Sequence, residues 1–137
     1  TGISIGVDRL TYAIEQFDKI NSSQKPLIVI ANLLAEKTST YISIAEQIRS
    51  EGYACEIYYG SSNLSKQLKY CDKRKASIVV IIGEDELKNN TISIKNLNMG
   101  KELSKNIDSR EEWKEVKAGQ LTIQPNDLIS ELNKILK

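Results

Sequence analysis

Two short, uninterrupted apolar runs constrain the fold of this chain most strongly: Leu27-Ile28-Val29-Ile30 and Ile78-Val79-Val80-Ile81-Ile82. A strand that is apolar at every position has no polar face, so it has to be buried on both sides of a sheet. Strands of this kind are typical of parallel sheets, which are covered by helices on both faces. Both runs are far too short to cross a bilayer, which needs roughly 20 residues.

Amphipathic segments separate these two runs. Residues 38–51 place apolar side chains on one helical face, and Gly52 is a typical stop signal after them. An aromatic and β-branched segment at 53–60 predicts a strand. A second helical pattern covers 61–75 and leads into the second apolar run. The order strand–helix–strand–helix–strand predicts right-handed crossovers and a parallel sheet.

The pattern changes to alternation after the second run. Ile92 and Ile94 are directed to one face, while Ser93 and Lys95 are directed to the other, toward water. The polar segment 83–90 predicts a hairpin loop, because its two asparagines tolerate the left-handed turn conformation. The strand is therefore expected to run antiparallel to the one before it.

The last third of the chain is read in the same way. Leu121 and Ile123 alternate as an inward pair of a strand, and Pro125 begins a final amphipathic helix. A short helix is expected at 111–115. The fold class is therefore α/β: a mixed, mostly parallel sheet of about five strands, flanked by helices.

The N-terminal segment is predicted to be a separate piece. A small-residue strand enters a turn at Gly6, and apolar positions then recur at helical spacing over 7–20. The polar stretch 21–26 is the predicted linker. We therefore divide the chain into residues 1–25, a strand–helix remnant of another domain with its linker, and residues 26–137, the α/β domain.

Composition excludes several kinds of chemistry. The chain has no histidine, so Ser-His-Asp and Cys-His catalysis and all histidine-containing metal sites are excluded. No metal site is predicted.

The two cysteines, Cys55 and Cys71, form no CxxC motif and are expected to be small buried side chains in a reducing cytosol. We expect a cytoplasmic protein.

The net charge of +1 hides one strongly basic helix. Within residues 61–75, five cations stand against a single acid, Asp72; the cations are Lys66, Lys69, Lys73, Arg74 and Lys75. The helix follows a strand end, where ligands of open α/β sheets collect. We interpret it either as a solvated helix face or as a surface that contacts phosphate. No Walker A loop or GxGxxG motif follows any strand.

Three further features at the predicted strand ends allow two interpretations each. Tyr59 and Tyr70 either pack or stack on an unpaired base. Ser61-Ser62-Asn63 either cap a helix or bind phosphate. The acidic cluster 84–86 is either a polar loop or a guanine reader, because a carboxylate accepts hydrogen bonds from the two adjacent donors of guanine's free edge.

Together, several of these segments resemble one family. The blocks YGSSNLSKQLKYCDKRKASIVVIIGEDEL and TISIKNL lie within residues 27–97, which resemble the anticodon-binding domain of histidyl-tRNA synthetases. The stretch GISIGVDRL, near the start of the chain, resembles the third signature motif of class II aminoacyl-tRNA synthetases. The chain thus resembles the C-terminal part of a histidine–tRNA ligase.

The resemblance implies an ATP-dependent enzyme for the whole protein. It implies that the full-length ligase uses ATP with Mg²⁺ to activate histidine, charges histidine tRNA and is a homodimer. By the motif match, Arg9 is the expected catalytic residue of the full-length enzyme and contacts the ATP phosphates. Gly6 lets the nucleotide approach the backbone. Without the first two class II motifs, this chain alone is expected to be non-catalytic and to bind no cofactor.

For the RNA, the resemblance implies recognition of the anticodon loop with the sequence GUG. Glu86 is expected to read guanine, with Glu84 as second choice. Further contacts are expected from the matched blocks and from the end of the first strand: Lys66, Gln67, Tyr70, Lys95 and Asn32. No DNA or membrane partner is expected.

Three alternatives remain open on the sequence. The chain is a stand-alone α/β module that binds a small phosphorylated ligand, or the anticodon domain of a threonyl-, prolyl- or glycyl-tRNA synthetase. The third alternative is a regulatory domain that kept the fold and lost its RNA surface.

Overall fold

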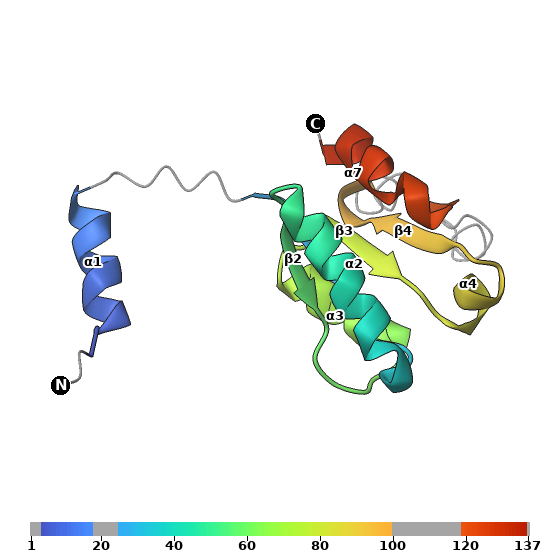
Figure 1. The fold of residues 1–137 in the computed structure, drawn as a ribbon, viewed down its shortest axis with the longest axis horizontal. Helices are drawn as coiled ribbons and strands as arrows, with labels where there is room; N and C mark the ends of the chain where they lie inside the picture. Colours follow the sequence, from blue (N-terminus) through green and yellow to red (C-terminus); the bar gives the residue numbers. More distant parts are fainter. Residues whose placement is uncertain (1–3, 18–24, 100–118, 137) are drawn as a thin grey trace, which may run out of the picture.

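A five-stranded sheet forms the centre of the molecule (Figure 1). The computed structural model describes residues 4–17, 25–99 and 119–136. The strands are β1 (Leu27–Ile30), β2 (Ala54–Ile57), β3 (Ile78–Ile81), β4 (Ile92–Asn96) and β5 (Gln120–Ile123), in the spatial order β2-β1-β3-β4-β5. β1 is parallel to β2 and β3, whereas β4 is antiparallel to β3 and β5. The predicted mixed sheet is confirmed.

Helices cover both faces of this sheet. They are α2 (Thr38–Ser50), α3 (Leu64–Lys73), α4 (Glu84–Lys88) and α7 (Leu128–Leu136), with 3-10 turns at Ala35–Lys37 and Pro125–Asp127. α2 and α7 pack on one side, which we call the α2/α7 face, and α3 packs on the other, the α3 face. α4 lies between β3 and β4 in the chain, at one end of the sheet (Figure 1).

The alternation of side chains along the strands divides the core in two. On the α2/α7 face, isoleucines of β1, β3 and β4 pack against Tyr41, Ile48, Leu128 and Leu132, all four with no exposed surface. On the α3 face the core is smaller, and Cys71 and Ala76 contribute to it where the other face has larger side chains. The apolar runs are therefore buried on both sides, as predicted.

The segment after β3 is a helix and not the predicted hairpin loop. α4 begins after Gly83, and Glu86 accepts a hydrogen bond from the Gly83 N–H at 3.0 Å. Three acidic residues in its first turn also favour the helix, because they lie near the positive end of its dipole. The left-handed asparagine is confirmed, since Asn90 has φ of 51°.

Two predictions about strand faces are wrong in part. Ser93 is only 2% exposed, because α4 and β5 reach its hydroxyl, so this side chain does not face water. Ile123 packs against the α2/α7 core as predicted, but Leu121 is 44% exposed. Lys95 is half-buried on the α3 face, opposite Val79.

The N-terminal segment forms one described helix, α1 (Val7–Phe17). Ser4–Gly6 are irregular, so the predicted strand is absent from the part of it that is described. In Figure 1, α1 stands away from the sheet. Residues 18–24 and the expected helix at 111–115 lie outside the described residues, and the division at residue 25 stays a prediction.

Candidate nucleic-acid interface

The carboxyl ends of β1, β2 and β3 meet at one edge of the sheet, because these strands are parallel. The chain leaves β1 toward α2 on one face and reaches β3 from α3 on the other. The switch between the two directions lies between β1 and β3. There, the buried Tyr41 hydroxyl donates to the Ile82 carbonyl at 2.9 Å and accepts from the Leu34 N–H at 3.2 Å. The switch point is thus filled by the protein's own side chain.

Gln67 connects α3 to two of the strand ends. Its side-chain oxygen accepts from the Asn32 N–H at 2.9 Å, and its amide nitrogen donates to the carbonyls of Asn32 and Ser62, both at 2.7 Å. The side chain is fully buried. Asn32 in turn donates its side-chain amide to the Gly60 carbonyl at 3.4 Å. The predicted residues Gln67 and Asn32 are therefore brought together, although Gln67 is too buried to contact RNA directly.

Glu86 has an internal role at the same edge. One carboxylate oxygen accepts from the Gly83 N–H, and the other accepts from the Ser93 hydroxyl at 2.9 Å. A carboxylate offers about four lone-pair sites, so each oxygen keeps one for a further donor. A Cβ on Gly83 would lie 3.2 Å from Glu86 Oε2 and 3.5 Å from Leu33 Cδ1, so a larger residue would shift that carboxylate by a few tenths of an ångström.

These contacts form a continuous line along the sheet edge. Gln67 bonds to Asn32, the next residue Leu33 lies against Gly83, and Gly83 bonds to Glu86. We call this line the C-terminal rim. Lys66 belongs to the first turn of α3 at this rim, where Asn63 caps the helix by accepting from the Lys66 N–H at 3.0 Å. The basic helix α3 and the acidic helix α4 therefore begin at the same edge of the sheet. The capping interpretation of Asn63 is confirmed.

Two of the predicted contact residues lie less centrally. Glu84 is exposed at the start of α4 and forms a loose ion pair with Lys88 at 3.7 Å. Lys95 lies two residues past Ser93 on β4, opposite Val79, and so farther from the rim. Ser93, which holds Glu86 in place, was missed, and the Gly83–Glu86 spacing of a helix cap was the available signal.

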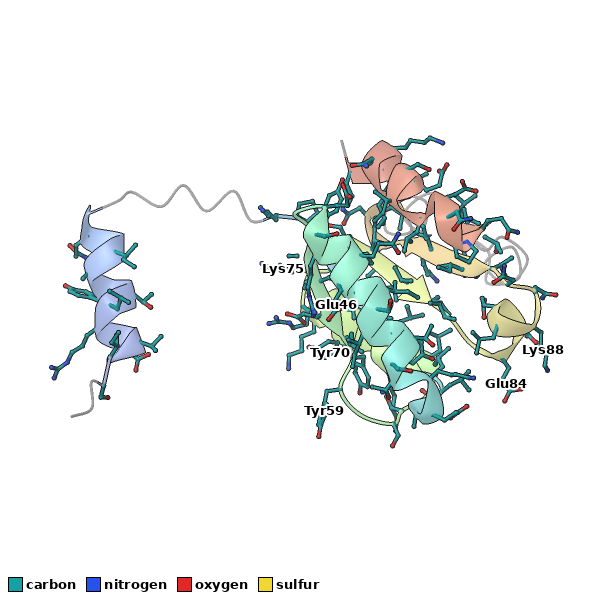
Figure 2. All side chains as sticks on the ribbon, viewed as in Figure 1. Glu46, Tyr59, Tyr70, Lys75, Glu84 and Lys88 are labelled. Carbon is teal, nitrogen blue, oxygen red and sulfur yellow. The ribbon has the colours of Figure 1, made fainter. Side chains whose placement is uncertain are left out.

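Aromatic side chains lie beside the rim on the β2–α3 side. Tyr59 is fully exposed, whereas Tyr58 packs edge-to-face on Tyr70 with ring centroids 5.2 Å apart. The Ser62 hydroxyl donates to the Tyr58 hydroxyl at 3.0 Å. In Figure 2, Tyr59 lies at the edge of the molecule and Tyr70 farther along it. An exposed ring in this place is suited to stacking on an unpaired base.

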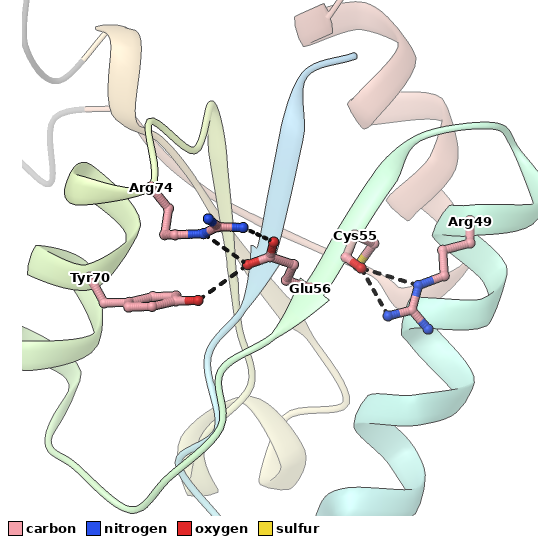
Figure 3. Close-up of polar contacts among 5 residues, drawn as sticks. All are labelled: Arg49, Cys55, Glu56, Tyr70 and Arg74. Carbon is pink, nitrogen blue, oxygen red and sulfur yellow. Dashed lines mark hydrogen bonds and ion pairs between the residues drawn. The ribbon is translucent and has the colours of Figure 1, made fainter. Parts of the chain in front are cut away.

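Tyr70 also belongs to a polar cluster on the α3 face. Its hydroxyl donates to Glu56 Oε2 at 3.2 Å, and Arg74 pairs with the same carboxylate through Nε and Nη2 (Figure 3). The hydrogen bond from Arg74 lowers the pKa of Glu56 below its usual value. Removal from water and the Glu56 charge raise the pKa of Tyr70. Tyr70 is therefore anchored by its hydroxyl, while 36% of the residue stays exposed.

The two cysteines are buried and unpaired, as predicted. Burial raises the pKa of Cys55 and of Cys71 to about 11, so neither thiol is a reactive nucleophile near neutral pH. Arg49 donates twice to the carbonyl of Cys55, which anchors α2 to β2 (Figure 3). Within the described ranges, no group of three or more acidic or cysteine side chains is arranged to hold a metal ion.

The residues predicted to contact ATP lie on the N-terminal segment. Gly6 precedes α1 and its carbonyl accepts from the Leu10 N–H at 3.0 Å, while Arg9 is exposed in the first turn. In Figure 1, α1 stands away from the sheet that carries the C-terminal rim. In the part of the chain that the structure describes, no helix is long and apolar enough to span a bilayer.

Comparison with known families gives a match to the family described as "Anticodon binding domain" over residues 27–132. Among curated relatives, the histidine–tRNA ligase of Ruegeria pomeroyi is 34% identical over 137 residues, and that of Bartonella henselae is 36% identical over 139 residues. Each alignment covers 99% of this chain. The chain spans only 27% and 28%, respectively, of the length of these two relatives.

Solved structures show the same fold. A histidyl-tRNA synthetase from Nostoc sp. PCC 7120 superposes with a TM-score of 0.65 and 24% identity, over 97% of this chain and 28% of that one. The RNA binding domain of threonyl-tRNA synthetase from Cryptosporidium parvum Iowa II gives a TM-score of 0.59 with 12% identity, over 81% of this chain and 23% of that one.

Proposed function

Because the chain belongs to the anticodon binding domain family, we propose that it recognises the anticodon loop of histidine tRNA as part of a longer histidine–tRNA ligase. The C-terminal rim is the observation that carries the proposal. It joins the basic helix α3 to the carboxylate of Glu86 through Gln67, Asn32 and Gly83. A strand of RNA at this edge would meet cations for its backbone and a carboxylate for its bases.

The Glu86 carboxylate is the proposed guanine reader. Gly83 and Ser93 each take one of its lone-pair sites, which fixes its orientation and leaves the remaining sites for the two donors of guanine. Glu84 is exposed beside it and is the second candidate. Tyr59 offers a stacking surface, and Lys66, Lys95 and the Tyr70 ring offer further contacts.

The rim also favours this function over a small-ligand module. Tyr41 fills the switch point between β1 and β3, where α/β modules commonly hold a nucleotide or cofactor. Exposed groups are spread along the rim, which suits an extended polymer. For the longer protein we propose ATP with Mg²⁺ as cofactors, Gly6 and Arg9 as nucleotide contacts, a homodimer and a cytoplasmic location.

Binding of this chain to RNA hairpins tests the proposal. Hairpins with GUG and CUC loops on the same stem are compared by fluorescence anisotropy at several salt concentrations. We expect the GUG hairpin to bind more tightly, with an affinity that falls steeply as salt rises. Equal affinity for the two loops would overturn specific reading by this chain.

Two variants separate the reading role of Glu86 from its structural role. Glu86→Gln should reduce the preference for GUG over CUC by about tenfold, because the amide presents a donor to one of guanine's donors. Ser93→Ala removes one of the two internal hydrogen bonds to Glu86 but keeps the carboxylate, which the Gly83 N–H still orients, so it should retain the preference. Loss of the preference in Ser93→Ala alone would contradict direct reading.

A further inference from the structure

A second basic feature lies at the opposite end of the sheet from the C-terminal rim. A pocket of about 560 Å³ opens where β1 and β3 begin and where α3 ends. Its charged lining residues are Lys25, Glu56, Lys73, Arg74 and Lys75, and Ser77 lies beside them. The strands between the two ends are four residues long, so this pocket lies about 13 Å from the rim along the strand direction.

The lining of this pocket is strongly cationic. Four cations face a single carboxylate, and that carboxylate, Glu56, is already bound by Arg74 and the Tyr70 hydroxyl (Figure 3). The pocket therefore keeps a net positive charge of three. Three of its cations are consecutive in the sequence, from the last residue of α3 to Lys75. The fold adds Lys25, which precedes β1, to this basic segment.

α3 connects the pocket to the C-terminal rim. Lys66, Lys69, Tyr70 and Lys73 recur at helical spacing and are exposed on one face of the helix, while Gln67 and Cys71 are buried on the other. The ten residues of α3 span about 15 Å. In Figure 2, Tyr59, Tyr70 and Lys75 follow one another along this side of the domain. A line of cations therefore runs from the rim to the pocket.

The backbone at the pocket is also unusual. Lys75 has φ of 56°, a left-handed conformation that usually falls to glycine at the end of a helix. It follows α3, and the Ala76 N–H closes the helix by donating to the Cys71 carbonyl at 2.9 Å. A lysine thus occupies a position where glycine would be less strained.

We propose that this pocket binds phosphate groups of the RNA strand whose loop is held at the C-terminal rim. The proposal rests on the proposed function and adds a second, sequence-independent contact to it. RNA backbone is the favoured ligand because the cationic line is continuous with the rim. A free polyphosphate has the same chemistry and is distinguished in the experiment.

The test compares wild type with the double variant Lys73→Gln/Lys75→Gly. Glycine at position 75 removes a cation and relieves the strain of the left-handed backbone there, so the thermal midpoint of unfolding should stay unchanged or rise. Lys134→Gln is the matched control, because Lys134 is an exposed lysine of α7 on the other face of the sheet. Each protein is titrated with GUG and CUC hairpins and with the unpaired GUG loop oligonucleotide.

We expect the double variant to bind both hairpins about tenfold more weakly than wild type at low salt. The slope of log affinity against log salt should become shallower by about 0.7 to 0.9 for each RNA phosphate that the variant no longer neutralises. Affinity for the loop oligonucleotide, and all affinities of Lys134→Gln, should stay within about twofold of wild type. The hairpins differ from the oligonucleotide by the stem next to the loop, so an equal reduction for both would overturn a contact between the pocket and RNA phosphates outside the loop.

Other outcomes are also decisive. Hairpin binding that is unaffected in the double variant overturns the pocket proposal alone and leaves the rim in place. If tripolyphosphate stabilises wild type but not that variant, while hairpin affinity is unchanged, the pocket belongs to a free polyphosphate and the RNA assignment is wrong. Failure of wild type to bind either hairpin overturns both proposals.

Discussion

The same strands contribute side chains to both faces of the sheet, but the two faces differ in what they bury and expose. The α2/α7 face packs large aliphatic side chains and Tyr41 under two helices. The α3 face has one helix, a smaller core with Cys71 and Ala76, and an outer surface lined with lysines. The larger core lies on the α2/α7 face, and the row of exposed lysines on α3 lies on the other. Stability and binding can therefore be altered separately by choosing the face.

The largest effect is expected from truncation on the α2/α7 face. Leu132 is fully buried on α7, so Leu132→Ala should lower the free energy of unfolding by about 2–5 kcal/mol. The matched change on the other face, Cys71→Ala, removes a single sulfur atom and should cost about 1 kcal/mol. Urea unfolding with constant m-value measures both. Equal losses would abolish the distinction between the faces.

An intermediate effect is expected where the α3 face meets the rim. Gln67→Ala removes three hydrogen bonds and leaves the N–H and carbonyl of Asn32 without their side-chain partner. This should lower the free energy of unfolding by about 1–3 kcal/mol. Lys66→Ala, on the exposed side of the same turn, should change stability by less than about 0.5 kcal/mol. A destabilisation by Lys66→Ala as large as that by Gln67→Ala would mean that the exposed side of α3 also holds the fold.

The smallest effect concerns Glu56 in acid. Its folded-state pKa lies below the unfolded value near 4.5, so its ionised form stabilises the fold above about pH 4.5, and this contribution is lost as pH falls through the folded pKa. Glu56→Gln should therefore weaken the dependence of stability on pH in this acidic window. Thermal melts between neutral pH and pH 3 measure it.

Glu46→Gln, on the exposed side of α2, is the matched control for this measurement and should leave the acid profile as it is. If Glu56→Gln and wild type lose stability in parallel as pH falls, the ion pair with Arg74 contributes nothing to folding. The charges of this ion pair would then have no effect on the free energy of unfolding.

The sequence predicted those elements whose pattern repeats over several residues. The apolar runs became β1 and β3, and the helical spacing in 38–51 and 61–75 became α2 and α3. α4 was missed because five residues are too few to show a helical period, and its formation depends on a cap at Gly83. The burial of Ser93 follows from that helix, so it could not be predicted before α4 was known.

The candidate site also has features that the sequence predicted and features that it did not. The basic helix and the acidic cluster were visible as charge patterns, and the parallel strands predicted that they meet at one edge. The internal role of Gln67 was not visible, because its partner Asn32 is 35 residues away. The basic pocket needs Lys25 near Lys75, and only the fold brings these residues together.

The Gln67 side chain extends the backbone hydrogen bonding of the sheet beyond the end of β1. Its amide reaches both the N–H and the carbonyl of Asn32, as a neighbouring strand would, and then extends to Ser62. The loops after β1 and β2 are thereby held in register before any ligand arrives. An incoming molecule would find a preassembled surface, so its association would lose little entropy to ordering the protein and could proceed near the rate of encounter.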